Sequence, residues 1–302
     1  MRRRPGHPGW TIPWLLLVVA ACSPNQATRS SAAAPAAATR AAASTLRFAV
    51  YGDTRTNNEV HQDIVNKVLT FSPDLVLQTG DLVHDGDALD QWMKFDEITS
   101  TMRRRIPYCP VRGNHDVGKK HYYEARVARC FGAGNKLFYS FEQRGVHFVG
   151  IDTEQALDPE SVQYRWLQAD LAAARGAGRF IIPFFHKAIV SVGPHSVEMD
   201  VQSLRPILHA LFRQYGISLV FQGHDHHYYH ARLDGITYVV SAGGGAPLYD
   251  WRAQPGAGDV FEKVYHFCIA DVEHTRITVT AYRQDLSQLD RFELPIAPAL
   301  IP

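Results

Sequence analysis

The stretch Ile217-Ser218-Leu219-Val220-Phe221-Gln222-Gly223-His224-Asp225-His226 places two histidines just after an apolar run. Such a run is typical of a buried β-strand, and the glycine ends it. Because side chains two positions apart in an extended chain point to the same side, His224 and His226 would present both imidazoles together. Paired neutral imidazoles suit a metal site. In a chain with 15 histidines they could also be two surface residues, so the remaining sequence decides.

Four more apolar runs end in short polar blocks. In open α/β sheets, ligands bind outside the carboxyl ends of the strands, so we expect these blocks to meet at one rim. Singly, each block has another interpretation, because Gly-Asp is a common turn, Asp can cap a helix, and a lone histidine is often a core residue. The runs and their blocks are 46–51 with Asp53, 74–79 with Asp81, 106–111 with Asn114, His115 and Asp116, and 179–184 with His186.

Helical periodicity separates these strands. A helix from Glu59 to about Phe71, capped by Asn57 or Asn58, completes one β-α-β unit. The sequence indicates one α/β domain over 46–302, with parallel strands in its first half and more antiparallel pairing in its second. Other predicted elements are helices at 88–101, 120–128 and 201–215, a helix beginning at Asp158-Pro159, a hairpin of 137–141 with 146–151, antiparallel strands at 236–240, 264–269 and 276–281, and a flexible loop at 241–246.

The N-terminal residues read as a targeting segment. Arg2-Arg3-Arg4 precede an apolar run, Trp10–Ala21, that is too short to span a bilayer comfortably. Small residues before Cys22 resemble a bacterial lipobox, which predicts a signal peptide over 1–22 and membrane contact through a lipid anchor on that cysteine. The alternative is an ordinary secretory signal with an incidental Cys22. The Ala/Ser/Pro-rich residues 23–45 then form a tether. We expect an exported lipoprotein of the bacterial cell envelope, on the periplasmic or outer-membrane face.

Charge and cysteine content narrow the class further. The 31 Lys and Arg balance 30 Asp and Glu, so nothing indicates nucleic-acid binding. Once Cys22 is assigned to lipid, Cys109, Cys130 and Cys268 remain. A Cys109–Cys130 disulfide is favoured because both cysteines flank one predicted helix, whereas Cys268 lies in an apolar strand-like run. Three buried thiols would give the same sequence.

Taken in order, the blocks Gly-Asp, Gly-Asp, Gly-Asn-His-Asp, a lone His after a strand, and Gly-His-x-His resemble the calcineurin-like metallophosphoesterase superfamily. The resemblance covers about residues 46–282. It implies a four-layer α/β/β/α sandwich of mixed sheets, with a dinuclear metal site at the carboxyl edge of the strands. It further implies two divalent or trivalent ions, Fe, Mn or Zn.

Carried over by position, the resemblance assigns Asp53 and His226 to the first metal. It assigns Asn114, His186 and His224 to the second, with Asp81 as the bridge. Such a pair of metals holds a bridging hydroxide that attacks phosphorus. His115 would protonate the leaving group.

Two positions depart from the family pattern. Many members carry a metal-binding His where this chain has Arg55, which stays charged and cannot ligate. Arg55 could instead clamp phosphoryl oxygens, or form a salt bridge within its loop. His84 stands where purple acid phosphatases carry an iron-binding Tyr, so the chain resembles that exported branch without its Tyr. His84 could complete the first metal, hydrogen-bond His115, or be a plain loop residue.

The expected function is metal-dependent hydrolysis of a small-molecule or lipid phosphoester. Two alternatives stay open: a phosphodiesterase or nucleotide or phospholipid hydrolase of the same fold, and a non-catalytic, surface-anchored binding protein. Asp116 and Asp225 could orient neighbouring imidazoles or be solvated carboxylates. Residues expected at the rim are His195, Tyr228, Tyr229, His230, the loop 243–245 and Tyr249.

Overall fold

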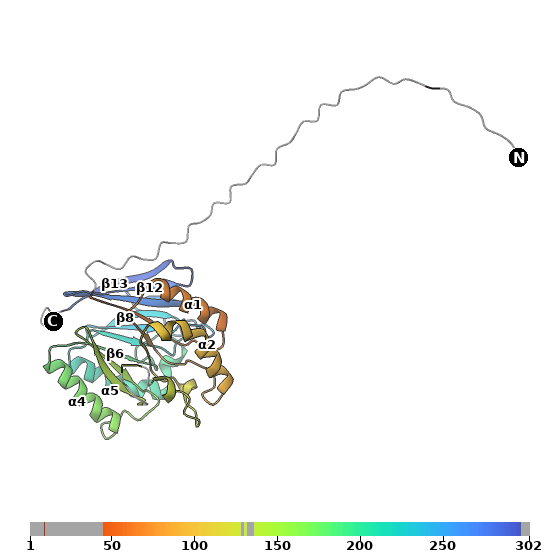
Figure 1. Ribbon diagram of the computed structural model, residues 1–302. Helices are drawn as coiled ribbons and strands as arrows, with labels where there is room; N and C mark the ends of the chain where they lie inside the picture. The colour runs from red at the N-terminus through yellow and green to blue at the C-terminus, as the bar shows by residue number, and fades with distance from the viewer. Residues whose placement is uncertain (1–8, 10–44, 128–129, 132–135, 297–302) are drawn as a thin grey trace. The chain divides into compact units, whose positions relative to one another are not determined.

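Two mixed β-sheets form the centre of the fold (Figure 1). The computed structural model describes residues 9, 45–127, 130, 131 and 136–296; the predictions for the N-terminal 44 residues therefore lie, apart from Gly9, outside the described part. The first sheet has the spatial order β13 (Gln288–Pro295), β12 (Arg276–Arg283), β11 (His266–Val272), β1 (Leu46–Tyr51), β2 (Leu75–Gln78) and β3 (Tyr108–Pro110). The second has the order β10 (Val260–Glu262), β8 (Tyr228–Leu233), β9 (Ile236–Ser241), β7 (Leu219–Gln222), β6 (Phe180–Phe185), β5 (Val146–Ile151) and β4 (Tyr139–Gln143).

Parallel pairing holds the part of each sheet that leads to the polar blocks. β1, β2 and β3 run parallel, with Ala49 beside Val76 and Leu77 beside Cys109. In the second sheet β5, β6, β7 and β9 run parallel. The other neighbours in both sheets are antiparallel.

Helices cover the outer faces of the sheets. Buried residues of α1 (Asn58–Thr70) and α2 (Leu89–Arg105) pack on the first sheet, and those of α4 (Val162–Gly176) and α5 (Met199–Gln214) on the second. The short helices are α3 (Glu124–Val127), η1 (Asn114–Asp116) and η2 (Pro194–Val197). The predicted α/β/β/α sandwich is confirmed. Within the described residues no helix is long and apolar enough to cross a bilayer.

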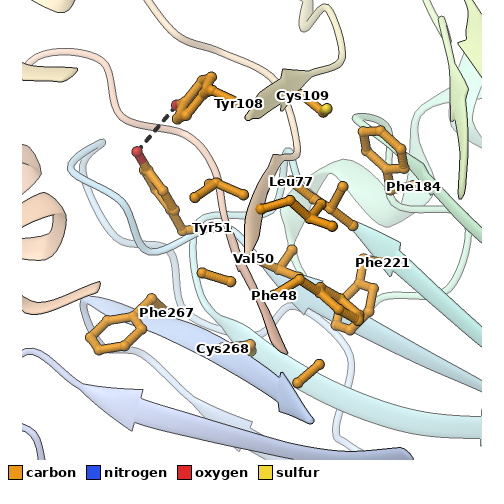
Figure 2. Packing of buried hydrophobic residues seen from close by; sticks show 14 of the residues in the cluster. Phe48, Val50, Tyr51, Leu77, Tyr108, Cys109, Phe184, Phe221, Phe267 and Cys268 are labelled. Atoms are coloured by element: carbon orange, nitrogen blue, oxygen red, sulfur yellow. Dashed lines mark hydrogen bonds between the residues drawn. The ribbon is translucent and has the colours of Figure 1, made fainter. Parts of the chain in front are cut away.

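Aromatic packing joins the two sheets. The Phe48 ring on β1 lies edge-on to two rings of the second sheet, 5.2 Å from Phe148 and 6.0 Å from Phe221. Figure 2 shows Phe48 beside Phe221. Nearby, the buried hydroxyls of Tyr51 and Tyr108 hydrogen-bond each other at 3.1 Å. This apolar interface fixes how the strand ends of one sheet face those of the other.

The disulfide prediction is confirmed, whereas several element boundaries were wrong. Cys109 and Cys130 are bonded, and Cys268 is a buried free thiol. The fourth helix is capped by Ser161, which accepts the Tyr164 N–H, while Asp158 instead forms a turn with the Glu160 N–H. Only 124–127 of the segment expected as the helix 120–128 is described as helical.

The second half holds more strands than expected. β8, β10 and β13 were missed, and β9 pairs parallel with β7 as well as antiparallel with β8. The loop 241–246 is buried, and its Ala246 N–H donates to the Asp53 carbonyl at 2.8 Å, so it lies on the side of the assigned ligands as predicted; its flexibility stays a prediction. Gly244 donates to the Gly52 carbonyl at 2.8 Å, and a Cβ at Gly244 would stand 2.3 Å from that oxygen. Only glycine allows this close approach.

Candidate metal centre

The strand ends bring the six proposed metal ligands together. Asp53 follows β1, Asp81 follows β2, and Asn114 begins η1 after β3. His186 follows β6, and His224 and His226 follow β7. One ligand atom each from Asp53, Asp81 and His186 lies within 4.8 Å of the other two. The rim expected from the sequence therefore exists, built from both sheets.

Four ligand atoms converge at the place assigned to the second metal. His186 Nε2 lies 3.0 Å from Asn114 Oδ1, 3.1 Å from His224 Nδ1 and 3.4 Å from Asp81 Oδ1. The Thr79 carbonyl accepts the Nδ1–H of His186 at 2.9 Å, which turns Nε2 toward these atoms. Together these four atoms form a set that can hold a cation. Two imidazoles, an amide and a carboxylate fit Zn, Mn or Fe.

Two further acceptors face each other at the place assigned to the first metal. His226 donates its Nδ1–H to the Pro247 carbonyl at 2.7 Å, which leaves the Nε2 lone pair 3.3 Å from Asp53 Oδ1. That buried oxygen has no hydrogen-bond partner among the described residues, while Oδ2 accepts the His224 N–H at 3.1 Å. An orphaned carboxylate oxygen beside an imidazole lone pair also fits a cation.

Arg55 reaches into this first place. Its Nε donates to Asp81 Oδ2 at 3.1 Å, and its Nη2 lies 3.4 Å from His226 Nε2. Its Nη1 lies 3.3 Å from His84 Nδ1. The salt bridge of Arg55 considered from the sequence exists, but it joins the loop after β1 to the loop after β2 instead of lying within one loop. Both side chains are buried or nearly so, with Arg55 10% and Asp81 1% exposed.

His115 is held by the loop that contains His84. Its Nδ1–H donates to the His84 carbonyl at 2.7 Å, and its N–H donates to Asp81 Oδ1 at 3.0 Å. The two imidazole rings stack with centroids 4.9 Å apart. The backbone of His84, not its ring, thus makes the hydrogen bond to His115. Nε2 of His115 is left for a ligand.

Burial and neighbouring charges shift the pKa values of the carboxyl and imidazole groups at the two metal places. Burial raises the pKa of Asp53 well above its usual range. It would do the same for Asp81, but His186, His115 and Arg55 hold the pKa of that carboxyl below its usual value. Burial lowers the pKa of His226 to about 4 and that of His224 well below 6.5. Neutral imidazoles are the form that binds metal.

The backbone at three of these positions is strained. Asp53, Asp81 and His224 have φ values of 56°, 55° and 71°, in the left-handed region that non-glycine residues rarely adopt. Such strain persists where the surroundings enforce it, and it is common at functional sites. Next to them, a Cβ on Gly113 would lie 2.2 Å from Asp81 Oδ1, so a side chain there would displace the proposed bridging carboxylate.

The two carboxylates expected to orient imidazoles do something else. Asp116 accepts the N–H groups of Leu82, Val83 and Gly113. Asp225 Oδ1 accepts the His195 N–H at 3.0 Å. Both are buried, so neither is a solvated loop residue. They fix the backbone of the loops that carry the ligands.

Comparison with known proteins identifies the family. Residues 46–228 match the family described as Calcineurin-like phosphoesterase. The chain belongs to that family. Membership implies a dinuclear metal site, which agrees with the two places described above.

Curated relatives of this chain include plant purple acid phosphatases. Purple acid phosphatase 15 of Arabidopsis thaliana is 27% identical over 240 residues, which cover 66% of this chain and 45% of the relative. Purple acid phosphatase 23 of the same plant is 29% identical over 175 residues, covering 52% and 37%. The chain therefore spans less than half the length of these two relatives.

Solved structures with the same fold bear out the architecture of the chain. The purple acid phosphatase PPD1 from yellow lupin seeds superposes with a TM-score of 0.71 at 18% identity, over 83% of this chain and 53% of that one. GAP50 of Plasmodium, described as the anchor in the inner membrane complex, gives a TM-score of 0.69 at 17% identity, over 83% and 89%.

Part of the expected rim lies beside the residues assigned to the two metal places. The Tyr249 ring stacks on His226 at 4.1 Å, and the His195 ring lies 4.1 Å from that of His224. Sequence reasoning missed Glu198, which pairs with His195 Nδ1 at 2.7 Å and lies 3.6 Å from His224 Nε2. The His-x-x-Glu spacing was the available signal. The other aromatic and histidine residues expected at the rim form hydrogen bonds away from the assigned ligands. Tyr228 and His230 hydrogen-bond Asp290, and Tyr229 hydrogen-bonds Asp259.

A pocket of about 430 Å³ opens beside the first metal place. Arg55 and His84 belong to both the pocket and the metal centre. Leu82, Val83, His61 and Phe95 are its buried residues, and its polar residues come from α1, α2 and the preceding turns. The polar lining consists of Thr56, Asn58, Asp90, Gln91 and Lys94.

Proposed function

We propose that this chain is a metal-dependent hydrolase of phosphoric esters, with Asp53 and His226 at one metal place, Asn114, His186 and His224 at the other, and Asp81 shared. The observation that carries this proposal is the convergence of imidazole nitrogens on carboxylate and amide oxygens at both places. Metal ions bound there would supply Lewis acidity and a lowered pKa for coordinated water.

The chain's own residues would bind the ester and move one proton. Arg55 offers a planar fork of donors that suits two phosphoryl oxygens. His115 keeps Nδ1–H on the His84 carbonyl, so its Nε2 would carry the proton given to the leaving alkoxide. Burial lowers the pKa of His115, against the opposing effect of Asp81, which favours action below neutral pH because the acid must be protonated.

The pocket beside Arg55 supports a small polar leaving group. At about 430 Å³ it has the size of a site for a small organic molecule. Its polar lining, Lys94 among it, suits hydroxyl or anionic substituents better than acyl chains. We therefore place small-molecule phosphoesters ahead of phospholipids. A diester or nucleotide that fills the pocket is the alternative.

We also propose export with a lipid anchor on Cys22. The Cys109–Cys130 disulfide supports an oxidising compartment, because disulfides are rare in the reducing cytosol. Metabolic labelling with a radioactive fatty acid tests the anchor: label should enter the parent chain and be lost in Cys22→Ala. Label retained by the variant would contradict the anchor at this residue.

Hydrolysis of a defined panel tests the proposed activity. Purified protein loaded with Mn²⁺, Zn²⁺ or Fe should release product from p-nitrophenyl phosphate, its bis ester or sugar and nucleoside phosphates. Removal of metal should abolish turnover, and Asp81→Asn should lower it by several orders of magnitude. Failure to turn over any ester with any metal would defeat the proposal.

A further inference from the structure

Arg55 makes a set of contacts that a metal ion would otherwise make. Its three guanidinium nitrogens lie 3.1, 3.3 and 3.4 Å from Asp81 Oδ2, His84 Nδ1 and His226 Nε2. The Arg55 guanidinium can only donate, so the Asp81 oxygen and the two imidazole nitrogens act as acceptors in these contacts. Arg55 cannot be deprotonated in a protein, so a permanent positive charge occupies the first place.

The second place has no such occupant. Asn114 Oδ1, His186 Nε2 and His224 Nδ1 face one another without a cationic side chain among the described contacts. The two places thus start from different states. At the first place the Arg55 guanidinium already balances the negative charge of Asp81. At the second place the ligand atoms are in position without a cationic side chain among the described contacts.

We propose that Arg55 competes with a metal ion for the first place, so that the chain binds one ion tightly at the second place and another only weakly at the first. This inference rests on the metal-binding part of the proposed function and not on hydrolysis. The physical reason is that a second cation cannot enter while the fork stays on Asp81 and His226, because like charges at these separations repel strongly in a buried site.

Displacement of the fork has a consequence for the substrate. If Asp81 and His226 were to hold a metal ion at the first place, the buried salt bridge would break and Arg55 would lose its carboxylate partner. A phosphoryl group provides the replacement, since it accepts two parallel N–H bonds. The first ion and the anionic substrate therefore favour each other's binding.

Titration of the metal-free parent with Mn²⁺ tests the asymmetry directly. Calorimetry and native mass spectrometry should show two steps whose dissociation constants differ by at least about tenfold, since a charged hydrogen-bonded pair opposes only one of them. Inorganic phosphate should tighten the weaker step. Two steps of equal affinity would overturn the inference, and so would the absence of any Mn²⁺ binding.

Variants assign each step to its place. Arg55→Gln should tighten the weak step about tenfold and change the tight step by a smaller factor, because Asp81 is shared by the two places. His186→Ala should remove the tight step. Arg103→Gln is the matched control, because Arg103 is similarly buried in a pair with Asp96 away from the centre, and it should change neither step. If the weak step keeps its affinity in Arg55→Gln, the proposal is contradicted. If that variant does not fold, Arg55→Lys replaces it. The weak step should then tighten by less than in Arg55→Gln, and an unchanged affinity again contradicts the proposal.

These outcomes separate the inference from the proposed function. If hydrolysis fails on every ester while the two Mn²⁺ steps differ and respond to Arg55, the hydrolase proposal is wrong and the competition stands. If hydrolysis succeeds but both ions bind with equal affinity, the hydrolase proposal stands and the competition between Arg55 and a metal ion is wrong.

Discussion

His115 is the residue whose role can be separated from metal binding. Its Nδ1–H is committed to the His84 carbonyl, and its N–H reaches the proposed bridging carboxylate, so only Nε2 can act on a ligand. A general acid matters most when the leaving alkoxide is poor. We expect His115→Ala to lower kcat about 100-fold or more on an alkyl phosphate and much less on p-nitrophenyl phosphate.

The same residue fixes the direction of the pH response. Because burial lowers the pKa of His115 below 6.5, kcat on the alkyl ester should fall as pH rises through that lowered pKa, when the acid loses its proton. A pH profile for both esters, with metal content measured on each sample, checks this. Equal losses on the two substrates at full metal content would contradict the acid role.

Strand ends were predictable from sequence, whereas the contacts between them were not. Runs such as Leu46–Tyr51 are mostly apolar and are buried at every position, as central strands of such sheets require, and the residues that follow them were identified correctly as neighbours. The position of Arg55 depends on which acceptors the second sheet brings near β1, and no local pattern contains that information.

The missed strands show the same limit. β13 (Gln288–Pro295) is a sheet edge whose residues are mostly exposed or half-buried, so its composition reads as a loop. β8 follows the His-x-His motif after only one residue and alternates buried and less buried positions near its end. The start of α4 could not be fixed from sequence, because Asp158, Pro159 and Ser161 all favour a helix N-terminus and lie within four positions of one another.

The start of α1 gives a test at the level of one helix. Asn57 Oδ1 accepts the Val60 N–H at 3.2 Å, and Asn57 lies two residues after Arg55. Asn57→Ala removes this cap and should lower the free energy of unfolding by about 1 kcal/mol. Urea denaturation measures the change. Asn58→Ala, one residue inside the helix, is the control and should shift stability by less than half as much; equal losses would argue against capping.

Buried histidines connect the fold to solution pH. Burial lowers the pKa of His61 to about 3 and that of His266 to about 4, and both are fully enclosed. His61 lies between Tyr51 and Phe95, with its ring 5.8 Å from the Phe95 ring. Each is neutral in the folded chain over a range where an unfolded histidine binds a proton.

The sign of the effect follows from proton counts. Between pH 6.5 and the lowered values, the unfolded chain holds more protons, so folding stability is complete above pH 6.5 and falls as pH decreases, by about 1.4 kcal/mol per pH unit for each histidine. His61→Phe keeps a ring against Phe95 and removes one titrating group. Between pH 7 and pH 5, the metal-free variant should lose about 2 kcal/mol less than the parent in urea denaturation. His274→Gln, at an exposed position, should follow the parent. Parallel losses in the parent and His61→Phe would show that His61 is not neutral in the folded protein at pH 5.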